Sequence, residues 1–164
     1  GDMKAITTAI ALIFIAVSMA AAAGSPPVKS SVSKDANYYN AGVDLMLAKN
    51  FTDAEKQFRK ALEGNERFAE AHNNLAYTLR KQGPDHYADA LQHYNRAIEL
   101  KPDLAEAYMY RGVLHIQMAN PSLAQEDHNT LVAMNSPLAA ELQYVVENGH
   151  EKEPEQFFGV SRKM

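Results

Sequence analysis

The hydrophobic and small residues of this chain follow a helical spacing in six consecutive segments. They fall into three pairs: Tyr38, Ala41, Gly42 and Leu45 with Ala54, Phe58 and Ala61; His72, Leu75, Ala76 and Leu79 with Ala90, Tyr94 and Ala97; and Tyr108, Gly112 and His115 with Ala124, His128 and Leu131. Residues three and four positions apart lie on one face of a helix, so each segment is predicted to be an amphipathic helix. The two helices of each pair are expected to face each other.

Two series of small residues set the length of the repeat: Gly42, Ala76 and Gly112, and Ala54, Ala90 and Ala124. Small side chains at such places let two helices approach closely. The steps from Gly42 to Ala76 and from Ala90 to Ala124 each span 34 residues. The steps from Ala76 to Gly112 and from Ala54 to Ala90 each span 36 residues. One insertion between Ala76 and Ala90 explains both lengths. Because Gly83-Pro84 is a turn signal inside this window, the insertion is predicted to lengthen a turn at 83–86.

Several residues mark where the helices begin. Asn50 precedes the second helix as a predicted capping residue, and Pro121 fits the first position of the sixth helix. Asp103 is predicted to cap the fifth helix, with Glu106 three residues further on.

A seventh helix is predicted after the three pairs. It begins at Ser136-Pro137, carries Leu138, Leu142 and Val145 on one apolar side, and ends at Asn148-Gly149. The last repeat of a stacked array has an open apolar face, and a helix with one apolar side can cover it. Residues 138–149 are therefore predicted to be a capping helix, and residues 150–164 a tail.

Three stretches of the chain resemble tetratricopeptide repeats: Asn40-Ala41-Gly42, Ala54-x-x-x-Phe58-x-x-Ala61, and Ala90-x-x-x-Tyr94-x-x-Ala97-x-x-x-x-Pro102. The resemblance implies an all-α fold, a right-handed superhelical solenoid of three helix-turn-helix repeats (35–68, 69–104 and 105–137) followed by the capping helix. The chain departs from the family pattern at Lys49 in place of a turn glycine, at Glu66 in place of a terminal proline, and at His128 in place of an aromatic residue. The departures weaken the third repeat most.

The N-terminal segment has the layout of an export signal. Gly1 and Asp2 precede Met3 and are interpreted as additions to the natural start. A basic Lys4 is followed by an apolar stretch and by small residues at Ala21-Ala22-Ala23, which predicts a signal peptide over residues 1–23 and an exported, periplasmic protein. The alternative is an uncleaved anchor in the inner membrane that leaves the protein facing the periplasm, because the apolar stretch is near the shortest length that spans a bilayer. Residues 24–34, rich in proline and small polar residues, are predicted to be a flexible linker.

Composition and motifs narrow the classes of function. The net charge is -4 and no run of basic residues is present, which argues against nucleic acid as a partner. The chain contains no cysteine, and its six histidines do not have metal-ligand spacing, so no metal or other cofactor is expected. It carries no nucleophile motif and no glycine-rich phosphate loop after a strand, so we do not expect an enzyme.

The family resemblance implies a peptide-binding groove along the first helix of each repeat. The groove is expected to comprise Tyr39, Val43, Met46, Asn73, Tyr77, Arg80, Met109, Val113 and Ile116. Most of these residues are apolar or aromatic, and a contiguous exposed stripe of this kind marks an interaction site. Some family members grip a terminal carboxylate with a lysine and an asparagine, but Tyr39 and Val43 occupy those positions here. Arg80, with Asn73 beside it, is the expected polar handle.

The stripe predicts a protein or peptide partner with an apolar helical or extended segment. The leading hypothesis is a non-catalytic, exported adaptor or assembly factor that holds such a segment. The alternative is a self-associating structural subunit, a homo-oligomer, whose tail or N-terminal segment fills the groove. The tail cluster Phe157-Phe158-Val160 is a candidate ligand for the groove, within its own chain or from a neighbour. Membrane contact is expected only through an uncleaved N-terminal segment.

Overall fold

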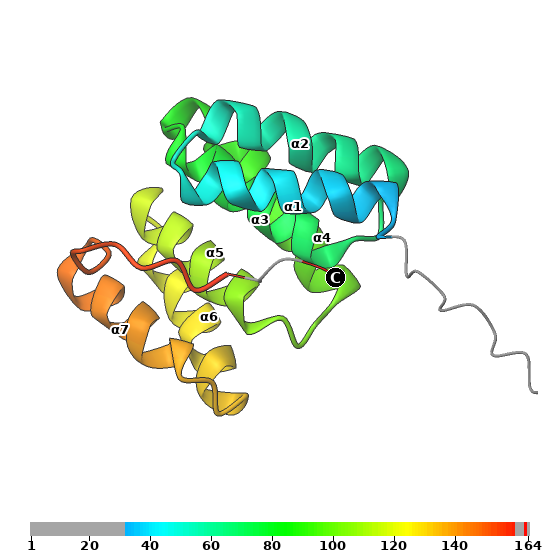
Figure 1. The fold of residues 1–164 in the computed structure, drawn as a ribbon. Coiled ribbons are helices and arrows are strands. Elements are labelled where there is room, and N and C mark those ends of the chain that lie inside the picture. The colour runs from blue at the N-terminus through cyan, green and yellow to red at the C-terminus, as the bar shows by residue number, and fades with distance from the viewer. Residues whose placement is uncertain (1–31, 160–162, 164) are drawn as a thin grey trace, which may run out of the picture. The chain divides into compact units, whose positions relative to one another are not determined.

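The computed structural model of this chain describes residues 32–159 and residue 163 and is helical (Figure 1). The helices are α1 (Lys34–Leu47), α2 (Phe51–Gly64), α3 (Ala69–Lys81), the short 3-10 helix η1 (Pro84–His86), α4 (Tyr87–Leu100), α5 (Ala105–Gln117), α6 (Pro121–Ala133) and α7 (Leu138–Asn148). The predicted signal peptide and most of the linker lie outside the described residues. Among the helices that are described, none combines the length and the apolar character that crossing a membrane requires.

The helices stack in chain order. Within each repeat the two helices pack as a pair, α1 on α2, α3 on α4 and α5 on α6, and each pair packs on the next. Helix α7 contacts both α5 and α6, which confirms its prediction as a cap on the third pair. The described part of the chain contains no strand. The predicted all-α solenoid of helix pairs is therefore confirmed.

The two-residue insertion lies in the turn where the repeat lengths placed it. Residues 48–50 join α1 to α2 and residues 118–120 join α5 to α6, whereas residues 82–86 join α3 to α4. In the short turns Lys49 and Ala119 have φ values of 60° and 59°, which is a left-handed conformation that costs a non-glycine residue about 1–2 kcal/mol. In the longer turn Gly83 has a φ of 109°, which glycine adopts readily, and Pro84 then begins η1.

The two series of small residues lie where helices meet. Ala54, Ala90 and Ala124 are all fully buried. A Cβ atom added to Gly42 would lie 2.7 Å from the Phe58 ring. The close approach of α1 to the ring of α2 therefore depends on the missing side chain at Gly42.

Two of the three predicted helix starts are as expected. The Asn50 side chain accepts a hydrogen bond from the Asp53 backbone N–H at 3.3 Å, and Pro121 is the first residue of α6. The predicted cap at Asp103 is wrong: α5 begins at Ala105 and its capping residue is Leu104, without a side-chain hydrogen bond. Leu104 is buried, so its packing rather than a polar cap sets this end of the helix.

The third repeat differs from the prediction in its core. His128 was expected to pack inward, but it is half-exposed, and the neighbouring Asp127 is buried instead. The Arg111 guanidinium of α5 donates to both oxygens of the Asp127 carboxylate, at 3.1 and 2.6 Å. A buried carboxylate requires a partner of this kind, and Arg111 lies opposite Asp127 rather than opposite His128.

A pair of histidines packs between α3 and α4. The rings of His72 and His93 stack with centroids 5.1 Å apart, and their Nδ1 atoms are 2.9 Å apart. Burial lowers the pKa of His72, and burial together with the charge of His72 lowers the pKa of His93 to about 4. Since a short Nδ1 to Nδ1 contact needs one donor and one acceptor, protonation of both rings would place two donors against each other.

The first prediction concerns the contact at Gly42. Gly42→Ala should lower the free energy of unfolding by about 1–3 kcal/mol, although alanine favours a helix more than glycine does, because the new methyl group would displace the Phe58 ring. Gly64→Ala is the matched control, since Gly64 lies at the end of α2 and faces only the side chain of Asp35. Urea denaturation measures both variants. Equal stability of the two would contradict the role of this contact.

The second prediction concerns the histidine pair. Both pKa values are depressed in the folded protein, so the stabilisation is complete above the unfolded value of about 6.5 and is lost as the pH falls toward 4. The melting temperature should therefore fall between pH 6.5 and pH 4, and His93→Gln should reduce this dependence. His128→Gln, at the half-exposed histidine, serves as the control. The interpretation is wrong if both variants follow the wild-type pH profile.

Candidate functional site

The segment that follows α7 turns back across the first helices of the repeats. In Figure 1 it is drawn in red and leaves α7 to cross α5 and approach α1. The turn begins at Gly149, whose φ is 78°. Glu151 contacts Arg80, Glu155 contacts Tyr77, and Lys163 contacts Glu70, so the tail runs antiparallel to α3. We call the surface formed by Asn40, Glu70, Tyr77, Arg80, Lys81 and Tyr110 the tail groove.

A buried arginine anchors one end of the tail. The Arg80 guanidinium donates to both oxygens of Glu151, at 2.9 and 3.2 Å, and to the Gln117 side chain at 3.2 Å. The Arg80 side chain is 0% exposed. Burial by itself lowers the pKa of Arg80, but Tyr94 and the Glu151 carboxylate outweigh it and hold the pKa above its usual range. The tail thus supplies the counter-charge that a buried arginine requires.

A second carboxylate of the tail, that of Glu155, also contacts α3. Glu155 accepts a hydrogen bond from the Tyr77 hydroxyl at 2.5 Å and another from the Lys81 ammonium at 2.9 Å. Burial raises the pKa of Glu155, yet these two hydrogen bonds outweigh it and leave the pKa below its ordinary value. Glu155 is therefore ionised at neutral pH, and its interaction with the groove is charge-assisted.

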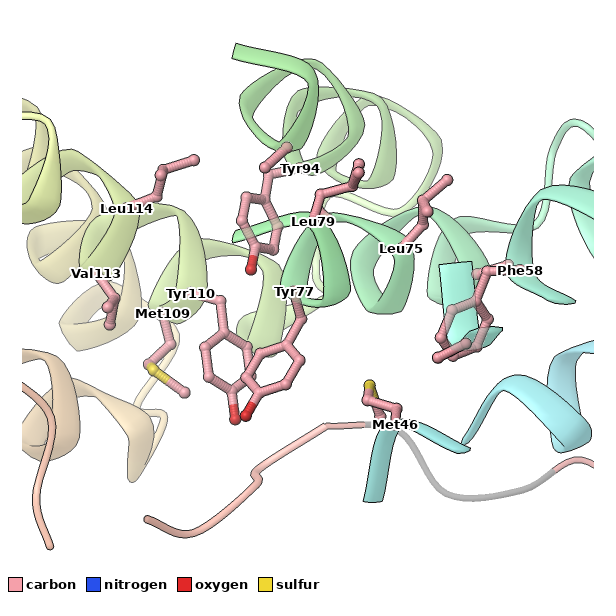
Figure 2. Close-up of a cluster of buried hydrophobic side chains, with 14 of the residues drawn as sticks. Met46, Phe58, Leu75, Tyr77, Leu79, Tyr94, Met109, Tyr110, Val113 and Leu114 are labelled. Carbon is pink, nitrogen blue, oxygen red and sulfur yellow. The ribbon is translucent and has the colours of Figure 1, made fainter. Parts of the chain in front are cut away.

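Aromatic rings form the middle of the groove. Tyr77 and Tyr110 lie side by side, as Figure 2 shows, with ring centroids 4.9 Å apart. The Phe157 ring packs against both, at 4.8 Å from Tyr77 and 5.8 Å from Tyr110. The Phe158 backbone N–H donates to the Tyr110 hydroxyl at 2.7 Å, and the Arg80 guanidinium lies over both tyrosine rings. The tail is therefore held through its backbone as well as its side chains.

The far end of the groove binds the backbone of residue 163. The Asn40 side chain donates to the Lys163 carbonyl and accepts from the Lys163 N–H, both at 2.7 Å. The Lys163 ammonium also lies 3.2 Å from the Glu70 carboxylate. An amide side chain that pairs with the N–H and the carbonyl of one residue recognises backbone and not a particular side chain.

The tail covers the groove without filling it. A cavity of about 360 Å³ remains between the tail and helices α5 and α7, lined among others by Met109, Val145 and Phe158. A different chain segment could therefore make contacts in this cavity that the tail does not make.

The expectation of an exposed stripe is wrong. Eight of the nine predicted groove residues are buried and Ile116 is half-buried. Tyr77 and Arg80 bond directly to the tail, and Met46, Met109 and Val113 line the spaces beside it. Tyr39 instead packs on Phe58 and Phe68 in the core, and Asn73 bonds to its neighbour Asn74.

The expected docking of the tail aromatics is present within one chain. Phe157 and Phe158 both contact the groove, whereas Val160 lies outside the described residues. Sequence reasoning missed four residues of the tail groove: Asn40, Glu70, Lys81 and Tyr110. Asn40 and Tyr110 stand two residues before the small residue of their repeat, as Asn74 does, so the same repeat register could have identified this series.

A metal site finds no support in the geometry. Within residues 32–159 and 163, no three histidine or acidic side chains lie close enough together to hold a metal ion. The polar groups of the groove are arranged to pair with carboxylates and with peptide backbone.

Comparisons with known proteins agree with the repeat assignment. The sequence profile described as "Tetratricopeptide repeat" matches residues 39–84, and the one described as "TPR repeat" matches residues 86–118. A human relative, "Tetratricopeptide repeat protein 6", is 32% identical over 83 residues. The match covers 51% of this chain and 16% of that protein.

Solved structures share the fold at low sequence identity. The first TPR of Spaghetti (RPAP3), bound to the HSP90 peptide SRMEEVD, has a TM-score of 0.64 at 16% identity and covers 73% of this chain and 94% of its own. PcrH in complex with the chaperone binding region of PopD has a TM-score of 0.61 at 20% identity and covers 68% of this chain and 86% of its own. The TPR2B domain of yeast Sti1, in a pHsp70 complex, has a TM-score of 0.63 at 20% identity and covers 72% of this chain and 100% of its own.

The third prediction concerns the attachment of the tail. Phe157→Ala should release the tail, because burying a phenylalanine ring contributes about 1.5–3 kcal/mol when burial is complete. Hydrogen exchange of the 151–158 backbone should become faster and binding of a hydrophobic dye should rise, while the helices keep their protection. Gln156→Ala, at the exposed neighbouring residue, is the matched control. If both variants exchange alike, Phe157 does not hold the tail.

Proposed function

Because this chain belongs to the tetratricopeptide-repeat family, we propose that it is a binding module without catalytic chemistry, which holds a non-helical segment of another polypeptide in the tail groove. The observation that carries the proposal is the occupied groove itself. A non-helical segment lies there with one backbone unit paired to Asn40 and another bonded to Tyr110. A groove that binds backbone in this way is suited to a polypeptide ligand.

The related structures support this proposal. The Spaghetti (RPAP3), PcrH and Sti1 structures are each complexes with a peptide or protein partner. These proteins share the fold and little sequence, so they support the class of ligand and not its identity.

We also propose that the protein acts outside the cytoplasm, as a periplasmic adaptor or assembly factor. The support is the uncharged apolar stretch between Lys4 and the small residues at Ala21-Ala22-Ala23. An uncleaved segment would leave the protein anchored in the inner membrane and facing the periplasm. Fusion of residues 1–34 to alkaline phosphatase, which is active only after export, tests this part of the proposal.

The alternative is self-association, in which the tail of one chain occupies the groove of the next. Gly149 would act as the hinge of such an exchange, and the contacts would be the same. Sedimentation equilibrium separates the two cases, because exchange yields a dimer or a longer assembly whereas docking within one chain yields a monomer.

The fourth prediction tests binding in the groove. A displayed library of 15-residue random peptides, selected on the full chain, should yield peptides that accelerate hydrogen exchange of the tail by displacing it. Measured in the full chain with its tail released by Phe157→Ala, Tyr110→Phe should weaken the binding of these peptides by about threefold to tenfold, because it removes one hydrogen-bonding hydroxyl and keeps the ring.

Tyr108→Phe is the matched control on the same helix. The Tyr108 hydroxyl donates to the Pro102 carbonyl and not to the tail. Selected peptides that bind both variants equally, or that leave the tail protected, would contradict binding in the groove.

A further inference from the structure

The tail groove has cationic side chains at one end and an anionic side chain at the other. This charge distribution determines which ligand it binds and in which direction. Resting on the function proposed above, we propose that the groove selects a non-helical segment with two carboxylates four residues apart, an aromatic residue two positions after the second, and a cation toward its C-terminal end. Such a segment binds antiparallel to α3. The chain's own tail has this order of residues and acts as the internal competitor of the partner.

The cationic end of the groove lies at the last turn of α3. Arg80 and Lys81 stand there and contact Glu151 and Glu155. The carbonyl groups at the end of a helix favour positive side chains, which adds to the stabilisation that the two carboxylates give these cations. Two carboxylates spaced as in the tail would reach both cations.

The anionic end lies at the first turn of α3. Glu70 stands there, its carboxylate 3.2 Å from the Lys163 ammonium. Burial raises the pKa of Glu70, but its backbone hydrogen bond and its bonds from Lys101 and Lys163 outweigh this and lower the pKa. Glu70 thus keeps its negative charge at neutral pH. A segment bound in the opposite direction would place its acids near Glu70 and its cation near Arg80, so like charges would face each other.

The aromatic middle of the groove sets the register. Tyr77 and Tyr110 flank the ring of Phe157, which stands two residues after Glu155. The Tyr77 hydroxyl bonds to Glu155 and the Tyr77 ring packs on Phe157, so one side chain contacts both the carboxylate and the aromatic residue of the segment. A shift of the segment by one residue would lose both contacts together.

The tail is suited to be displaced. It leaves a cavity of about 360 Å³ beside Met109 and Val145. A partner can fill this cavity with a larger side chain. The covalent attachment of the tail favours its binding over that of a free partner, because a short flexible connection gives the tail an effective concentration on the order of 1 mM.

The test compares the wild-type full chain with a released variant, the full chain that carries Glu151→Gln, Glu155→Gln and Phe157→Ala. The probe is a labelled synthetic peptide with the sequence of residues 150–163, and fluorescence polarisation gives its Kd. The released variant should bind the probe about tenfold more tightly than the wild type, as expected for a competitor at about 1 mM against a probe Kd of about 0.1 mM. Glu151→Gln alone, a smaller change to the fold, should give a smaller gain in the same direction.

Two control peptides test the proposed direction of binding and the selection for carboxylates. One has the same residues in reversed order, and the other has the glutamates that correspond to Glu151 and Glu155 replaced by glutamine. Each should bind the released variant about tenfold more weakly than the probe. Adding Arg80→Gln to the released variant should reduce the difference between the probe and the glutamine peptide, because Tyr77 and Lys81 still contact the second carboxylate, whereas adding Lys60→Gln, an exposed residue of α2, should preserve it.

Equal binding of the probe and the reversed peptide would overturn the proposed direction, and equal binding of the glutamine peptide would overturn the selection for acids. If the selected library peptides bind the released variant while the probe does not, this proposal fails and the proposed function stands. If neither the probe nor any library peptide binds the released variant, the proposed function fails as well.

Discussion

The close approach of two helices at a residue without a side chain is the constraint from which this architecture follows. At Gly42 the ring of Phe58 occupies the space where a Cβ atom would lie, and Gly112 makes the same kind of contact with Leu142 of the capping helix. These contacts bring α1 against α2 and α5 against α7. The same first helices carry residues that hold the tail, so the groove is a consequence of how the helices pack.

Within that groove Arg80 has the strictest requirement. A guanidinium with no exposed surface requires a counter-charge, and Glu151 provides it through two hydrogen bonds, while the buried Arg80 Nε has no partner within the described residues. Tyr77 and Tyr110 add their ring faces to the same cation. Any segment that replaces the tail has to meet this requirement or leave Arg80 open to water. The groove therefore combines an adaptable backbone contact at Asn40 with a strict charge contact at Arg80.

The sequence predicted the helices and the position of the insertion because both depend on local spacing and on turn residues such as Gly83-Pro84. It did not predict which surface would be exposed. The burial of Tyr77 and Arg80 comes from a tail more than 70 residues away in the chain, and helical periodicity carries no information on such a contact. The inward position of Asp127 in place of His128 likewise depends on Arg111 of another helix. Tyr110 occupies the same position in its repeat as Asn40 and Asn74, so the repeat pattern could have identified it. No sequence pattern indicates that its hydroxyl accepts a hydrogen bond from the Phe158 N–H.

The tail follows the groove in the sequence, and this order affects the newly synthesised protein. Synthesis proceeds from the N-terminus, so α1, α3 and α5 become available before residues 151–158 do. For a period each new molecule has an unoccupied groove, and a partner present at that moment meets no competition. Binding during biogenesis would then be governed by the order of arrival, whereas binding to the completed protein would be governed by affinity.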